Sequence, residues 1–330
     1  MSVKTELIRL FTEKKGEYLS GEELAERLSC TRAAVWKAVE QLRKEGYEIA
    51  AAQNRGYMLS ENNDLLSAEE LGSYLGSGKQ LRVYPEISST NDVLKGFAVS
   101  EGAPAGTTIL SDLQTGGKGR LGRRFFSPKG CGLYMSMLLR PEGSVTDNLI
   151  LTAQSAVAVY RAVKRVCGIE LGIKWVNDLY LDGRKVCGIL SEGQANFETG
   201  KLDFVIVGIG LNVYEPEEGY PEELQEKAGS LLGKRSAGAR VNRNLLAAEL
   251  IREFYRLSQE QGLAKEYSEK NIVPGHRVRI LDRGTVREAD ALRILPDGRL
   301  EVMETDGTKQ ALVYGEVSVR RGFLLDSSWI

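Results

Sequence analysis

The spacing of apolar residues in the N-terminal part of the chain predicts three short helices followed by a hairpin. Apolar side chains recur at helical spacing over residues 3–11, and a capping-box sequence at residues 20–23 begins a second helix. After a tight turn, a third helix extends from Thr31 to about Gly46. Because a hairpin with Arg55 at its tip follows, residues 1–63 are predicted to form a winged helix-turn-helix domain.

The third helix presents polar and basic residues on its outward face. Residues 27–55 contain six basic and three acidic residues, and this local excess favours contact with nucleic acid phosphates. The residues expected to contact DNA bases and phosphates are Thr31, Arg32, Lys37 and Arg55. Trp36 lies on the same face, where DNA contact and packing against another domain both remain open.

A change of pattern after residue 63 predicts two further domains. Residues 61–64 are polar and interrupt the periodicity, so they form the first linker. Strands and helices alternate irregularly over residues 64–270, which predicts an α+β domain. Its clearest strands are expected at residues 107–110, 132–139, 185–190 and 202–211, and its clearest helices at 148–166 and 242–261.

The last part of the chain, residues 271–330, has a third pattern. Short strands are expected at residues 277–281, 291–295, 300–304 and 310–314. Asp-Gly pairs separate several of these strands and are typical of tight hairpin turns. About sixty residues of such hairpins predict a small SH3-like barrel.

Composition excludes several classes of site. The chain of 330 residues has 44 basic and 45 acidic residues, so no global field attracts nucleic acid or a membrane surface. His276 is the only histidine, which nearly excludes Ser-His-Asp, Cys-His and histidine–metal catalysis. The four cysteines form no C-x-x-C pair, and the longest apolar run, residues 204–213, is half of the roughly 20 residues that a membrane helix needs. A reduced cytoplasmic protein is expected, whose chemistry depends on lysine, arginine and backbone amides.

Residues 116–124 are the most informative segment, because they combine four glycines with four cations. Closely spaced glycines let backbone amides approach an anion, and the cations neutralise it, so the segment suits a phosphate or a mixed anhydride. The pattern G-x-G-x-x-G is present, but no helix follows it as in a dinucleotide-binding loop. A solvated flexible loop is the alternative that composition alone leaves open.

Three further segments carry candidate chemistry. Residues 174–178 precede a turn that places Lys185 in the next strand. An alternative with equal support is that Asp178 only forms a turn and that Lys185 is only an exposed lysine of the strand. Gly208 and Gly210 follow a buried strand and indicate close approach of a side chain or ligand. Residues 88–91 supply hydroxyls and an amide before a helix, where an N-cap is the alternative.

Together these four segments resemble the biotin protein ligases, and with the winged helix in front they resemble the bifunctional type that also represses the biotin operon. Residues 117–125 are similar to the family signature G-R-G-R-R-G-R-x-W, with Lys118, Leu121 and Phe125 as replacements. Residues 174–178 are similar to K-W-P-N-D, with Val176 in place of proline. The likeness covers essentially the whole chain.

The resemblance implies which residues bind the two substrates. Those implied for biotin are Ser89, Thr90, Asn91, Gln114, Lys118, Gly119, Arg120, Lys185 and Gly188. Those implied for ATP and its phosphates are Lys118, Arg120, Arg123, Lys174, Asn177, Asp178 and Asn212. Lys185 and Arg120 have the catalytic roles, Asp178 binds Mg²⁺ that is held mostly by the substrate phosphates, and the segment after Val213 covers adenine.

The resemblance also implies an activity and its partners. An ATP-dependent, AMP-forming ligase of this kind makes biotinyl-5′-AMP and transfers biotin to a lysine of a biotin carboxyl carrier protein, such as that of acetyl-CoA carboxylase. With the adenylate bound it dimerises and represses transcription from operator DNA. The alternatives are a ligand-sensing regulator without catalysis, a lipoate-type protein ligase, and a ligase whose N-terminal domain no longer binds DNA.

Overall fold

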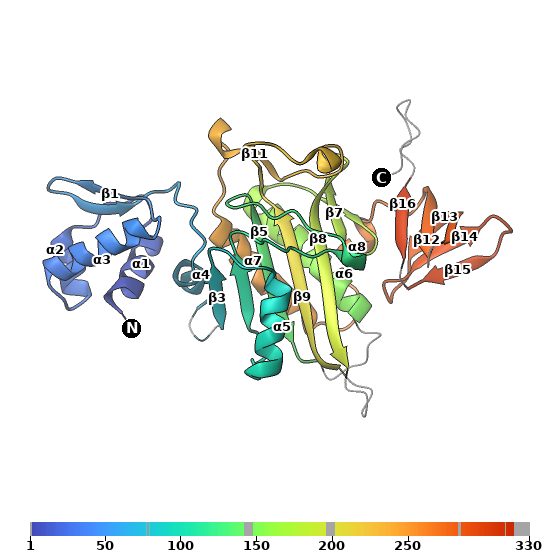
Figure 1. Cartoon of the computed structure of the whole chain (residues 1–330), viewed down its shortest axis with the longest axis horizontal. Helices are drawn as coiled ribbons and strands as arrows, with labels where there is room; N and C mark the ends of the chain where they lie inside the picture. The colour runs from blue at the N-terminus through green and yellow to red at the C-terminus, as the bar shows by residue number, and fades with distance from the viewer. Residues whose placement is uncertain are drawn as a thin grey trace.

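The computed structural model describes residues 2–76, 78, 80–141, 148–195, 202–282, 285–313 and 315–319. Figure 1 shows three parts in a row: a small helical part at the N-terminal end, a central part built on a large sheet, and a group of strands at the C-terminal end. The elements follow the order expected from the sequence, with a helix-turn-helix first, mixed helices and strands next, and short strands last.

The N-terminal part contains the three predicted helices and the hairpin. They are α1 (Val3–Glu13), α2 (Gly21–Arg27), α3 (Arg32–Lys44), β1 (Ile49–Ala52) and β2 (Gly56–Leu59). Ser20 and Thr31 cap α2 and α3, because their hydroxyls accept hydrogen bonds from backbone N–H groups at 3.0 and 3.2 Å. The helices enclose their own apolar core, in which Leu7, Phe11 and Leu24 are fully buried.

The central part is a seven-stranded sheet with the order β3-β4-β5-β9-β8-β7-β6. Its strands are β3 (Leu81–Tyr84), β4 (Thr108–Ser111), β5 (Gly132–Leu139), β6 (Gly172–Lys174), β7 (Asp178–Leu181), β8 (Arg184–Ala195) and β9 (Leu202–Asn212). All neighbouring strands are antiparallel except β3 and β4. The expected strands and helices of this domain are therefore confirmed, with ends that differ by a few residues.

Helices cover both faces of the sheet. Phe204 and Ile206 of β9 pack in the cluster under α5 (Thr90–Ser100), whereas Val205 and Val207 pack in the larger core with α6 (Asn148–Cys167) and α7 (Arg243–Ser258). Successive side chains of a strand point to opposite faces of the sheet. Because both faces of this sheet are covered, successive residues of β9 are apolar and do not alternate with polar ones. The remaining helices are α4 (Ala68–Leu75) and α8 (Lys265–Glu269).

The C-terminal strands form an antiparallel sheet with the order β15-β14-β13-β12-β16. They are β12 (Arg277–Asp282), β13 (Thr285–Ile294), β14 (Leu300–Glu304), β15 (Lys309–Leu312) and β16 (Glu316–Val319). The expected SH3-like barrel is not confirmed, because no pairing within the described residues joins β15 to β16. The strand expected at 291–295 is longer, since β13 pairs with β12 from Thr285 onward, and Tyr314 lies outside the described residues.

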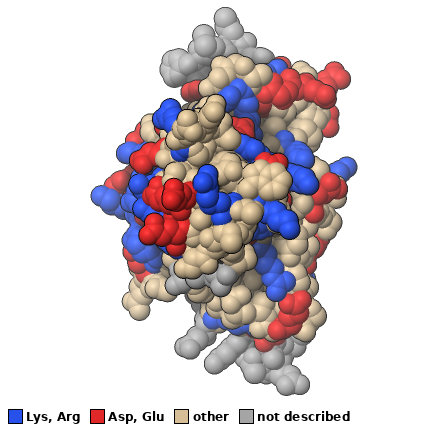
Figure 2. All heavy atoms as spheres, turned by 90° about the vertical axis from the view of Figure 1, so that its left-hand side faces the viewer, with Lys and Arg blue, Asp and Glu red and all other residues tan. Residues whose placement is uncertain are grey.

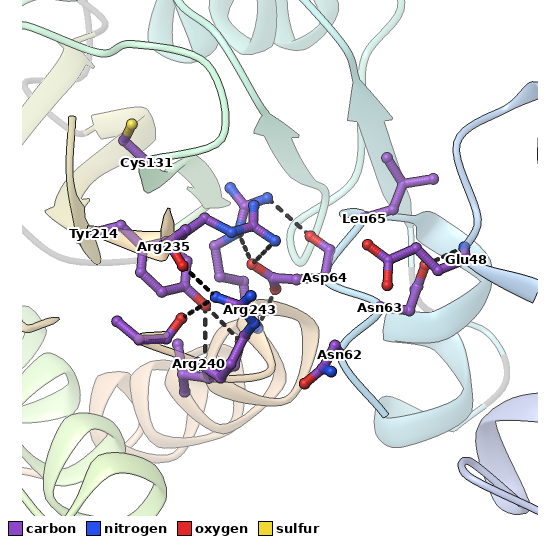
Figure 3. A network of polar contacts seen from close by, with 12 residues as sticks. Glu48, Asn62, Asn63, Asp64, Leu65, Cys131, Tyr214, Arg235, Arg240 and Arg243 are labelled. Atoms are coloured by element: carbon purple, nitrogen blue, oxygen red, sulfur yellow. Dashed lines mark hydrogen bonds and ion pairs between the residues drawn. The ribbon is translucent and has the colours of Figure 1, made fainter. Parts of the chain in front are cut away.

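A buried ion cluster joins the linker to the central part (Figure 3). Arg243 begins α7 with its side chain only 2% exposed, and its Nε donates to Asp64 Oδ2 at 2.8 Å. Its Nη1 donates to Asp112 Oδ1 and to the carbonyl oxygen of Gly132, both at 2.9 Å. The linker is therefore fastened to the starts of α7 and β5 by charged, buried contacts.

All four cysteines are free, and Cys187 is buried, whereas Cys131 and Cys167 are only partly buried. No helix in the described part of the chain has the length and apolar character needed to cross a membrane.

Arg243→Met should lower the free energy of unfolding by about 3–5 kcal/mol, because it leaves Asp112 without its cation and the buried Asp64 with only the more distant Arg235. Equilibrium urea unfolding checks this. Arg256→Met is the matched control on the same helix, since the Arg256 side chain is 47% exposed and should cost under about 1 kcal/mol. Equal losses for the two variants would contradict the role of Arg243.

Candidate functional site: a cation-rich cavity on the central sheet

One cavity of about 740 Å³ opens where the central sheet, the glycine-rich loop and the C-terminal sheet meet. It is lined by every residue that the family resemblance implied for biotin or ATP. These are Ser89, Thr90, Asn91, Gln114, Lys118, Gly119, Arg120, Arg123, Lys174, Asn177, Asp178, Lys185, Gly188 and Asn212. His276 is not among the residues that line the cavity.

Glycines form the part of the sheet that lies beneath the cavity. Gly188 and Gly210 are direct partners in the β8–β9 ladder. A Cβ atom on Gly210 would lie 2.5 Å from the ring of Phe125, and one on Gly208 would lie 2.3 Å from Asn91 Oδ1. The glycines that sequence analysis linked to close approach thus make room for Phe125 and Asn91, which in turn shape the cavity.

Small polar side chains form one end of the cavity. Gln114 Oε1 accepts hydrogen bonds from the Thr90 backbone N–H at 2.9 Å and from its hydroxyl at 3.1 Å. Ser136 donates to Thr90 Oγ1 or Asn91 Oδ1, at 2.7 and 2.6 Å. Ser89 stands at the N-cap of α5, but its side chain makes no capping bond there. The hydroxyl therefore does not serve as a helix cap and lines the cavity instead.

The glycine-rich loop folds back on itself. Phe125 N–H donates to Gly117 O at 2.9 Å, and Gly119 N–H donates to Arg123 O at 2.7 Å. Lys118 forms a 2.6 Å ion pair with Asp92, which raises the pKa of the lysine through their hydrogen bond. The loop is therefore held by contacts within itself and to α5, and no α-helix begins at its end in the described chain.

Arg120 links three regions of the chain at the cavity. Its Nη1 donates to Asn177 Oδ1 at 3.0 Å, and its Nη2 donates to the carbonyl oxygen of Gly315 at 3.2 Å. Asn177 in turn donates to Ile189 O at 2.7 Å. The guanidinium is thus held by the central sheet and by the C-terminal sheet at once.

Lys185 and Asp178 face one another across the β7–β8 hairpin. Lys185 Nζ lies 2.6 Å from Asp178 Oδ1, and both side chains are partly exposed to the cavity. Nearby, Lys174 is buried and its Nζ donates to Tyr180 OH at 3.5 Å. Burial raises the pKa of Tyr180, so this phenol stays protonated at neutral pH.

The segment between β10 (Tyr214–Glu215) and β11 (Leu232–Lys234) closes another side of the cavity. Lys185 N–H donates to Lys227 O at 2.8 Å, and Asn212 Nδ2 donates to Gly229 O at 2.9 Å. The segment is therefore tied to the strand that carries Lys185. It corresponds to the segment that the resemblance placed over adenine.

Sequence analysis missed several lining residues. Trp175, Phe126, Leu224 and Lys227 line the cavity, as do Gly315, Val317 and Ser318 of the C-terminal region. The last three come from a sheet whose position over the cavity depends on tertiary contacts, such as Trp175 Nε1 donating to Gly298 O at 2.9 Å. Trp175 belongs to the K-W-x-N-D segment, which was the one available signal.

The residues expected to contact DNA lie apart from the cavity, on the N-terminal part. Thr31, Arg32, Lys37 and Arg55 are all exposed. Arg55 lies over the ring of Tyr18 at 4.3 Å, and Trp36 is 55% exposed, so packing against another domain does not account for it. Figure 2 shows basic and acidic side chains interspersed on the N-terminal end of the molecule.

Two protein-family models match separate segments of the chain. Residues 83–212 match the biotin/lipoate A/B protein ligase family, and residues 4–58 match an HTH domain family. A bifunctional ligase/repressor BirA from Escherichia coli K12 is 31% identical over 97% of this chain and 98% of its own length. The chain belongs to the biotin protein ligases of the ligase/repressor type. The ligase/repressor BirA of Bacillus subtilis is 38% identical over 73% of this chain and 74% of its own length.

Solved biotin protein ligases share the fold of about three quarters of the chain. The Aquifex aeolicus enzyme in complex with biotin and ATP aligns with a TM-score of 0.61 at 28% identity, and covers 74% of this chain and 100% of its own. An apo structure of that ligase aligns with a TM-score of 0.59 at 25% identity.

Gly210→Ala should loosen the glycine-rich loop, because the new Cβ displaces the Phe125 ring that anchors it. Overpacking of this kind costs about 1–3 kcal/mol, so trypsin should cleave at Lys118 to Arg124 roughly five times faster or more. Gly233→Ala is the control, because a Cβ there meets nothing within 4 Å. Equal cleavage rates in the two variants would show that Phe125 does not anchor the loop.

Proposed function

We propose that the chain is an ATP-dependent biotin–protein ligase that also acts as a biotin-responsive repressor. The observation that carries the proposal is the cavity itself, where the polar cluster at Thr90 and Gln114 and the cations Arg120 and Lys185 line one space. The polar cluster suits a neutral ring such as the ureido group, and the cations suit a carboxylate and a triphosphate. The names of the relatives support the same activity.

In the first half-reaction a biotin carboxylate oxygen attacks the α-phosphorus of ATP. The new oxygen–phosphorus bond forms as the bond to pyrophosphate breaks, which leaves biotinyl-5′-AMP. Two anions must come together, and at 4 Å two unit charges interact by about 4 kcal/mol at an effective dielectric constant near 20. We assign Lys185 and Arg120 to offset this repulsion and to stabilise charge in the transition state.

Magnesium is assigned as part of the nucleotide substrate. The described residues contain no group of three or more acidic, histidine or cysteine side chains that could hold a metal ion. Asp178 alone, with the phosphates, fits an ion that binds through one or two carboxylates and substrate oxygens. When bound, the ion supplies charge neutralisation for the departing pyrophosphate. Asp178 would hold the ion together with the substrate phosphates, and Lys185 pairs with Asp178 at 2.6 Å in the structure.

In the second half-reaction a lysine amine of a biotin carboxyl carrier protein attacks the acyl carbon and expels AMP. The amine loses a proton to water or to a carboxylate such as Asp178. Because a mixed anhydride hydrolyses when exposed to water, the glycine-rich loop and the segment over the nucleotide should order when the adenylate forms. We assign the other cavity-lining residues to substrate binding. Lys118, Gly119 and Gly188 are assigned to biotin, and Arg123, Lys174, Asn177 and Asn212 to ATP.

Lys185→Ala should lower the rate of biotin-dependent ATP–pyrophosphate exchange about a hundredfold or more, which is the scale for losing one preorganised charge donor. Lys95→Ala, an exposed lysine of α5 outside the cavity, is the control. A Lys185→Ala rate within a few-fold of wild type would rule out the catalytic assignment.

The same assay separates the alternative functions. Exchange with biotin and not with lipoate supports the ligase proposed here, whereas exchange with lipoate alone favours a lipoate-type ligase. No exchange with either acid, in protein shown to be folded, favours a sensor without catalysis.

We further propose that the adenylate-bound protein dimerises and places two winged helices on an inverted repeat in operator DNA. The exposed positions of Thr31, Arg32, Lys37 and Arg55 support this assignment. Sedimentation of the protein with and without biotin and ATP tests the dimer, and it should be the larger species that binds DNA.

Lys37→Ala should weaken DNA binding and reduce the slope of log affinity against log salt by about 1, because one phosphate contact is lost. The probe is a duplex enriched from a random pool by the protein with biotin and ATP. Lys14→Ala is the control, since Lys14 lies beyond α1 and forms an ion pair with Glu17. Affinity that does not change with salt would argue against DNA binding by this face.

A further inference from the structure

We propose that Asp64 and Arg235 are positioning residues that couple the segment over the nucleotide to the N-terminal DNA-binding part. The proposal rests on the function proposed above and adds a regulatory connection to it. Asp64 lies in the linker with its side chain 2% exposed, and Arg235 Nη2 lies 3.5 Å from its Oδ2. Figure 3 shows Arg235 and Arg243 meeting at this one carboxylate.

Arg235 is directly connected to the segment that closes the cavity. It begins η4 (Arg235–Ala237), immediately after β11, where the segment ends. Its guanidinium carbon lies 5.0 Å from the centre of the Tyr214 ring, and Tyr214 is where the segment begins. Tyr214 OH is fastened to the start of α7, because it accepts from Val241 N–H at 2.9 Å and donates to Val241 O at 3.0 Å. Both ends of the segment therefore meet beside Asp64.

Asn63, the residue before Asp64, is fastened to the DNA-binding part. Its Oδ1 accepts from the Glu48 backbone N–H at 3.0 Å, and its carbonyl oxygen accepts from Lys15 Nζ at 2.8 Å. Lys15 Nζ also lies 3.3 Å from Glu70, whose side chain is fully buried. The linker is thus a bound segment between two parts of the molecule, and a shift of Asp64 also shifts the contacts of Asn63.

Charge balance gives Arg235 its importance. The buried carboxylate of Asp64 and the partly buried carboxylate of Asp112 both pair with Arg243, so these three groups carry a net charge of −1. An uncompensated charge away from water is costly, and Arg235, 33% exposed, is the cation that completes the cluster. A nucleotide that orders the segment holds Arg235 at Asp64, and the linker is stabilised in the same step. By reciprocity, a linker held in place by DNA strengthens nucleotide binding.

The test compares Arg235→Gln, Arg235→Lys and the surface control Arg256→Gln in the full chain. ATP–pyrophosphate exchange with biotin gives KM and kcat, and amide hydrogen exchange with and without MgATP and biotin reports on residues 61–66. We expect Arg235→Gln to raise the KM for ATP about fivefold, the low end of typical coupling, with kcat and the KM for biotin within about twofold of wild type. Arg235→Lys, which keeps the charge, should restore the KM for ATP.

The amide exchange readout needs no turnover and separates this proposal from the proposed function. In wild type, MgATP with biotin should slow exchange both in residues 216–231 and in the linker; in Arg235→Gln the linker effect should be lost. Two results would overturn the coupling. One is a KM for ATP that is equal in Arg235→Gln and Arg256→Gln, and the other is amide protection of the linker that persists in Arg235→Gln. No pyrophosphate exchange in wild type with linker protection present would overturn the ligase assignment and leave the coupling standing. If the two residues act together, the double variant Asp64→Asn/Arg235→Gln should weaken ATP binding, measured by the KM for ATP, by less than the two single changes predict when added.

Discussion

Repulsion between a carboxylate and a triphosphate is the constraint on which this architecture depends. The cations that line the cavity come from separate segments: Arg120 and Lys118 from the glycine-rich loop, and Lys174 and Lys185 from the β6 to β8 hairpins. Two of them have an acidic partner in the structure, Lys118 with Asp92 and Lys185 with Asp178. The cavity therefore brings positive charge from several elements into one space.

The sheet itself is adapted to this purpose. A continuous layer of side chains on β8 and β9 would fill the space beside the sheet where the cavity lies. Glycines at 188, 208 and 210 interrupt this layer of side chains. Phe125 then packs on the exposed backbone and connects the loop to the sheet, while Asn91 enters beside Gly208. The apolar strand residues that flank the glycines keep both helical layers attached, so the cavity forms without weakening the core.

Local patterns predicted the long helices and strands, and the family resemblance implied the lining residues, whereas long-range pairings were hidden in the sequence. The strand expected at 132–139 is β5 without change, because an apolar run between turn residues has few other solutions. By contrast, β13 begins earlier than expected, since its first residues are stabilised by pairing with β12. Asp64 and Arg243 are 179 positions apart, and nothing in the spacing of either residue marks the other as its partner. In the predicted linker at 61–64, the polar side chains of Asn63 and Asp64 make contacts within the protein.

The hydrogen bond from Arg120 to Gly315 has a consequence for the order in which the molecule is assembled. Lining residues extend from Ser89 to Ser318, so a growing chain has made its helix-turn-helix and the glycine-rich loop long before the C-terminal sheet can meet them. Domains fold as units from the N-terminus during synthesis, at about 5–20 residues per second. A nascent chain therefore passes through a period in which the DNA-binding part is complete and the cavity is open on one side. The C-terminal strands act as the final closure, and a reactive adenylate has no enclosed site until they are in place.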